Sequence, residues 1–75
     1  FNPGTAIRYS VVRGGWVNLK VYNALGQEVA TLVDGVMAPG EHQASFDAGN
    51  FSSGVYFYKM TSGAFVESRK MLLLK

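Results

Sequence analysis

The sequence predicts an all-β protein, a small antiparallel β-sandwich of six or seven strands. Turn-forming dipeptides and short turn segments recur at brief, even intervals along the chain, and each contains glycine. The runs between them are rich in β-branched and aromatic residues, which favour strands. No run has the period and caps of a helix. Short strands separated by regular turn signals are typical of a sandwich or barrel.

The composition fits one small domain held together by an apolar core. The chain has 75 residues, 48% of them hydrophobic, and no cysteine. Because disulfides and thiolate metal ligands are therefore excluded, burial of apolar side chains must supply the stability. The chain opens on Phe1 rather than methionine, so we expect residues 1–75 to be a single module, the C-terminal one, of a larger protein.

Charge and hydropathy exclude two classes of partner from the expected function. The net charge is +2, from seven basic and five acidic residues scattered along the chain. Such a mild excess gives no reason to expect nucleic-acid binding. No apolar run approaches the ~18–20 residues of a membrane-spanning helix, so we expect no stable membrane insertion.

Alternation of apolar and polar residues predicts the first two strands. Residues 5–12 place Ile7, Tyr9 and Val11 on one face, and residues 17–21 alternate in the same way. This is the period of a strand with one buried face. Gly14 and Gly15 between the runs predict a two-residue hairpin turn that pairs these strands.

Four further strands are predicted, over residues 28–33, 41–47, 55–61 and 64–74. In residues 41–47, His42, Ala44 and Phe46 share one face, opposite Gln43 and Ser45. Residues 55–61 are apolar on both faces, which predicts a central strand covered on both sides.

The sequence offers no combination of side chains suited to catalysis or to a cofactor. His42, Ser45 and Asp47 are close in sequence, but a strand directs His42 and Ser45 to opposite faces, where a base cannot reach its nucleophile. The carboxylates lack the spacing of a calcium loop, and no glycine precedes a helix that could bind phosphate. We therefore expect no enzyme, no metal and no cofactor.

Two aromatic residues leave a binding role open. Trp16 and Tyr22 lie on the strand face opposite Val17, Leu19 and Val21. Exposed rings on a β-sandwich can stack on sugars, which would make the chain a carbohydrate-binding module of a secreted hydrolase. The alternative is structural, with Trp16 covering one end of the sandwich and Tyr22 packing beside the neighbouring strand.

The stretch "SGVY", which contains Gly54 and Tyr56, resembles the corner that opens a late strand in immunoglobulin-like sandwiches. In that corner the tyrosine hydroxyl donates a hydrogen bond to upstream backbone. The fold is therefore expected to be immunoglobulin-like, with Gly54 and Tyr56 in a structural role.

A series of short motifs runs along essentially the whole chain: the opening "FNP", then "IRYSV", "VNLKVYNALGQEVATLVDG", "GEHQASFDA", "SGVYFYKM" and "KMLLLK", in that order. In this order and spacing they resemble the C-terminal sorting domain of the type IX secretion system, type A. The immunoglobulin-like domain of flagellar hook-capping proteins is similar in pattern.

The resemblance implies a non-catalytic export signal at the C-terminus of a secreted cargo. Implied partners are the outer-membrane translocon, a sortase-like peptidase and an N-terminal cargo domain. The implied route passes through the periplasm to the cell surface or the medium. The residues it assigns to translocon recognition are Lys59, Lys70, Met71, Leu72, Leu73, Leu74 and Lys75. A terminal strand of this kind can be bound by strand addition. A passive immunoglobulin-like spacer is a further alternative.

Overall fold

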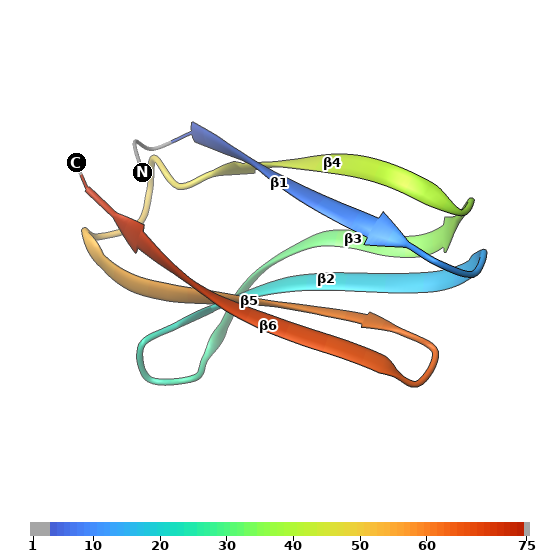
Figure 1. The fold of residues 1–75 in the computed structure, drawn as a ribbon. Helices are drawn as coiled ribbons and strands as arrows, with labels where there is room; N and C mark the ends of the chain where they lie inside the picture. Colours follow the sequence, from blue (N-terminus) through green and yellow to red (C-terminus); the bar gives the residue numbers. More distant parts are fainter. Residues whose placement is uncertain (1–3, 75) are drawn as a thin grey trace.

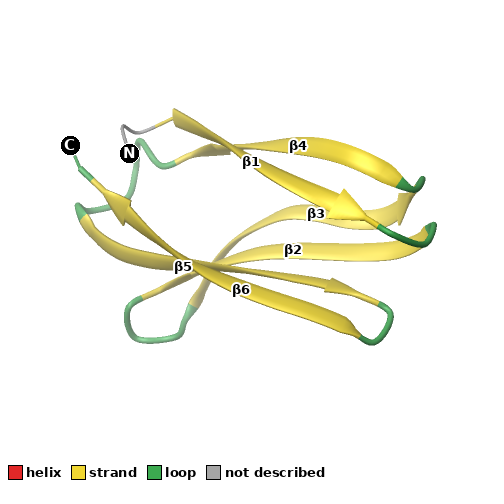
Figure 2. Ribbon diagram, viewed as in Figure 1, coloured by secondary structure: helices red, strands yellow, loops and turns green. Residues whose placement is uncertain are grey.

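The computed structural model describes residues 4–74, and all its regular structure is β-strand. The six strands are β1 (Gly4–Val11), β2 (Gly15–Asn23), β3 (Glu28–Met37), β4 (Gly40–Asp47), β5 (Gly54–Ser62) and β6 (Phe65–Leu73). They form a sandwich of two antiparallel sheets (Figures 1 and 2), which confirms the predicted fold class. Phe1, Asn2, Pro3 and Lys75 lie outside the described residues.

The two sheets are unequal in size. One contains β1 and β4 alone, and the other has the order β3-β2-β5-β6. In immunoglobulin lettering these orders correspond to B-E and C′-C-F-G. Strands A and D, which flank B and E in that fold, have no counterpart among residues 4–74.

The predicted hairpin at Gly14 and Gly15 is wrong. β1 pairs with β4 along its whole length, from Gly4 opposite Asp47 to Val11 opposite Gly40. β2 lies in the other sheet, between β3 and β5. The reason is burial: both strands have an apolar face, and the two faces cover each other only when the strands lie in opposite sheets.

The core lies between the sheets and is built from the inward positions of alternate residues. Its buried members are Ile7, Tyr9, Val11, Val17, Leu19, Val21, Ala44, Phe46, Ala48, Tyr56, Met60 and Leu73. The alternation predicted for residues 5–12, 17–21 and 41–47 is therefore confirmed.

Two predictions about the four-stranded sheet need correction. β3 continues past residue 33 to Met37, because it pairs with β2 as far as Gly15. β5 is central, between β2 and β6, as expected. It is not covered on both sides, however, since Phe57 is 39% exposed and Lys59 is also exposed. The outer face of this sheet has no second layer among residues 4–74.

Local hydrogen bonds fix the entry to β5. The Tyr56 hydroxyl donates a hydrogen bond to the backbone carbonyl of Ser52 at 2.7 Å, as the resemblance to the corner implies. Phe51 lies between two core rings, with its centroid 5.7 Å from that of Phe46 and 6.1 Å from that of Tyr56. The crossover from β4 to β5 is therefore anchored by both a hydrogen bond and ring contacts.

The loop from β2 to β3 is organised by one side chain. The Asn23 Oδ1 atom accepts hydrogen bonds from the backbone N–H groups of Leu25 and Gln27, each at 3.0 Å. Asparagine favours turns because its side chain can replace a backbone acceptor in this way. This local closure sets where β3 begins.

Candidate interaction surface

The hairpin of β5 and β6 presents a continuous exposed surface on the outer side of the four-stranded sheet. Residues paired across two strands lie on the same side of the sheet. Phe57 lies opposite Lys70, and Lys59 lies opposite Ser68. We call the surface formed by Phe57, Lys59, Val66, Lys70 and Leu72 the outer β5–β6 face.

The apolar ending of the chain is divided between the core and this surface. Leu73 is fully buried and Met71 is half-buried against the core. Leu72 is 51% exposed and Leu74 is 58% exposed. The structure therefore places Lys59, Lys70 and Leu72 on the same side of the sheet, and it separates them from Met71 and Leu73, which pack inward. Lys75 lies outside the described residues.

The outer β5–β6 face is basic as well as apolar. Neither Lys59 nor Lys70 forms an ion pair within the described part of the chain. Lys20, opposite Lys59 on β2, differs because its Nζ lies 3.2 Å from Glu28 Oε1. The hydrogen bond and the charge of Glu28 raise the pKa of Lys20. Two exposed ammonium groups beside exposed apolar side chains suit a partner surface that is acidic and apolar.

Trp16 and Tyr22 are poorly placed to stack on one sugar. Both lie on the outer side of β2, six positions apart along the strand, which is about 20 Å. Trp16 is 59% exposed, but its Nε1–H donates a 2.9 Å hydrogen bond to Asp34 Oδ1. Tyr22 is half-buried and lies opposite Phe57. The two rings therefore do not form a shared platform.

His42 has a structural environment. Its ring stacks on Tyr9 with centroids 5.4 Å apart, and its Nε2 lies 2.7 Å from the backbone oxygen of Ala38. Ser45 lies on the opposite face of β4 from His42 and points away from the core. Residues 4–74 contain no group of three or more side chains suited to hold a metal ion. Nor do they contain a helix long and apolar enough to cross a membrane.

Phe57 and Val66 belong to the surface but were not identified from the sequence. The signal was present for Phe57, because a strand that buries Tyr56 and Met60 must direct Phe57 and Lys59 to the other side. The alternation that buries Leu73 likewise directs Val66 outward, but the neighbours of Val66 on β5 depend on the register between the two strands. Val66 lies opposite Thr61.

The fold is that of a small immunoglobulin-like β-sandwich domain. Residues 2–74 match the model of the secretion system C-terminal sorting domain. The match covers almost the whole chain, and the chain belongs to this family. Comparison with curated proteins gave no significant match, and neither did comparison with solved structures.

Proposed function

We propose that the chain is a non-catalytic sorting signal that the outer-membrane type IX translocon recognises directly. Membership of the family supports a C-terminal signal for type IX secretion attached to an N-terminal cargo. Beyond this, the outer β5–β6 face is the surface that the translocon recognises, and the chain itself catalyses no reaction. Cargo carrying the domain crosses the periplasm and then reaches the cell surface or the medium, where a sortase-like peptidase acts on it.

The observation that carries the proposal is the outer β5–β6 face. On it Lys59 lies diagonally across from Lys70 on the adjacent strand, and Leu72 follows two positions along β6, although Lys59 is distant from the other two in sequence. Isolated surface leucines are ordinary, but exposed apolar side chains gathered together and rimmed by polar groups are typical of an interaction site. Acidic groups on the translocon would pair with the two ammonium groups, and apolar groups would cover Phe57, Val66 and Leu72.

The position of β6 adds a second element of recognition. β6 is an edge strand, so alternate backbone N–H and C=O groups point away from β5. A translocon strand can pair along this edge while its side chains reach the outer β5–β6 face. The proposed recognition segment also includes Leu74 and Lys75, which follow β6 in the sequence.

The test is an export assay in a bacterium with a type IX system. Residues 1–75 are fused to the C-terminus of a fluorescent reporter that carries a signal peptide. Export of the parent fusion is compared with that of the Lys59→Ala/Lys70→Ala and Leu72→Ser variants. Arg13→Ala is the matched control, because it removes an exposed charge from the loop between β1 and β2.

We expect the parent and Arg13→Ala fusions to reach the surface or the medium, with the double lysine and Leu72→Ser variants retained in the periplasm. Equal melting temperatures would show that retention is not due to unfolding. If the well-folded variants are exported as efficiently as the parent, the translocon recognises a different surface of the sandwich. If the parent itself stays periplasmic, the sorting role fails.

A further inference from the structure

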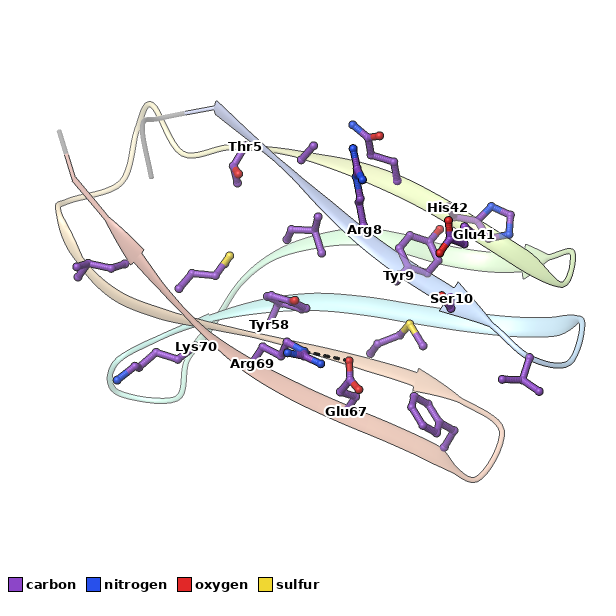
Figure 3. A pocket seen from close by; sticks show the side chains of 18 residues that line it. Thr5, Arg8, Tyr9, Ser10, Glu41, His42, Tyr58, Glu67, Arg69 and Lys70 are labelled. Carbon is purple, nitrogen blue, oxygen red and sulfur yellow. Dashed lines mark hydrogen bonds and ion pairs between the residues drawn. The ribbon is translucent and has the colours of Figure 1, made fainter.

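A second candidate site lies on the other side of the β5–β6 hairpin, between the two sheets. A cleft of about 1130 Å³ runs along β1 from Thr5 to Ser10 and is bounded opposite by β5 and β6 (Figure 3). Of the residues that form the outer β5–β6 face, only Lys70 and Leu72 border this cleft. The cleft therefore goes beyond the proposed sorting surface.

The cleft exists because the smaller sheet ends at β1. β1 pairs with β4 on one side only, so its other backbone edge has no partner strand among residues 4–74. In immunoglobulin sandwiches of the constant type, strand A pairs with B at this position. β1 corresponds to B, and the place of a strand A lies in the cleft.

The floor and rim of the cleft have different chemistry. Tyr58, Met60 and Met71 form an apolar floor from the inner face of β5 and β6. At the rim, Phe65 is half-exposed, and the Arg69 Nε lies 3.2 Å from Glu67 Oε1. One more strand in the cleft would cover the exposed apolar area of this inner sheet face, beside the paired charges at its rim.

We propose that an extended peptide segment of a separate partner protein binds in this cleft by pairing with β1. Six β1 positions, Thr5 to Ser10, line the cleft, so the paired segment spans about 20 Å. Backbone hydrogen bonds supply affinity in strand addition, and alternate side chains supply specificity.

Cross-strand pairing defines the sequence that this segment should have. Ile7 and Tyr9 face the core, so residues opposite them enter the cleft over Tyr58 and Met71 and should be apolar. Arg8 is exposed on the other side of β1 and forms no ion pair within residues 4–74. Opposite charges pair favourably across strands, so the residue opposite Arg8 should be acidic. The expected pattern is apolar–acidic–apolar.

A second copy of this chain fits the cleft less well. Pairing β1 with another β1 brings the two Arg8 guanidinium groups toward each other, and pairing with β6 brings Arg69 and Lys70 instead. A single peptide strand meets neither obstacle.

The test uses purified residues 1–75 and a fluorescent peptide of about seven residues, which spans the β1 positions at ~3.3 Å per residue. The peptide alternates valine with threonine and carries one central glutamate. Control peptides carry lysine in place of glutamate, or N-methyl groups on the backbone amides. Anisotropy measures binding to the parent chain, to Arg8→Glu and to Arg13→Glu, which carries the same charge change in the loop that follows β1.

We expect saturable binding of the glutamate peptide, and loss of binding on N-methylation. Arg8→Glu should weaken the glutamate peptide about fivefold and favour the lysine peptide instead, since one cross-strand charge pair has that order of effect. Arg13→Glu should bind as the parent does. This result does not depend on export, so it stands or falls separately from the sorting role.

Three results would overturn the inference. The first is the absence of saturable binding, or binding that survives N-methylation. The second is self-association of the chain at the concentrations used, measured by sedimentation, that competes with the peptide. The third is failure of the complete exported protein, with its cargo attached, to bind the peptide, because a segment of the same polypeptide would then occupy the cleft.

Discussion

The hydroxyl of Tyr56 and the backbone carbonyl of Ser52 are joined by a 2.7 Å hydrogen bond at the point where the chain enters the four-stranded sheet. Tyr56 is buried, so the bond is shielded from water on its inner side. It ties the first inward residue of β5 to the crossover from β4. In a domain without disulfides, this bond is one of the contacts that hold the crossover against β5.

Replacing Tyr56 with phenylalanine should measure the contribution of that bond. We expect Tyr56→Phe to lower the free energy of unfolding by about 1–2 kcal/mol, because a shielded carbonyl loses its donor. The melting temperature should fall by about 4–8 °C per kcal/mol in a domain of this size. Tyr22→Phe is the control, since the Tyr22 hydroxyl makes no hydrogen bond with residues 4–74. Equal melting temperatures for both variants would contradict the anchoring role.

A side chain at Gly54 should destabilise the fold, although there is open space around this residue. Its φ of +150° is a conformation that residues with a Cβ rarely adopt, and no atom lies within 4 Å of the position that a Cβ would take. Gly54→Ala should therefore cost about 1–3 kcal/mol through backbone strain alone. Gly35→Ala is the matched control, with open space and no such φ. Urea denaturation that shows the same midpoint for both variants would exclude strain at Gly54.

Substitutions at Leu72 and Leu73 should distinguish a residue that stabilises the core from one on the proposed recognition surface. Leu73→Ala should lower the free energy of unfolding by about 2–5 kcal/mol, because it leaves a cavity in the core. Leu72→Ala, on the outer β5–β6 face, should change it by less than about 0.5 kcal/mol. Thermal unfolding of the two variants checks this difference. If Leu72→Ala is the more destabilising, the assignment of inward and outward positions in β6 is wrong.

Tyr9 should make the fold sensitive to alkaline pH. Burial raises the pKa of Tyr9 above its ordinary value of 10.0. The protonated form is thus favoured in the folded state, and this stability is fully present below the unfolded pKa. It is lost as the pH rises through the folded pKa, because the unfolded chain then releases the proton first.

The check compares the parent with Tyr9→Phe by urea denaturation at about pH 8 and about pH 11, which bracket the tyrosine pKa. The parent should lose more stability than the variant over this interval. Lys20, whose pKa is also raised, is common to both proteins, so its contribution cancels in the comparison. Parallel losses in the two proteins would show that Tyr9 titrates alike when folded and unfolded.

Local patterns in the sequence determined the strands and the direction of most side chains. Alternation was sufficient to place Ile7, Val17 and Phe46 in the core, because the two-residue period of a strand fixes which face each residue occupies. The resemblance at Gly54 and Tyr56 located the entry to β5 for a similar reason: the corner requires particular residues within a short segment.

Only the tertiary structure decided which strands became neighbours. Gly14 and Gly15 are compatible with a hairpin, yet β1 and β2 lie in different sheets because their apolar faces must cover each other. The same holds for the candidate surface, where Lys59 and Lys70 meet through the register of β5 with β6. Strand pairing depends on contacts between residues far apart in sequence, and a local pattern does not contain that information.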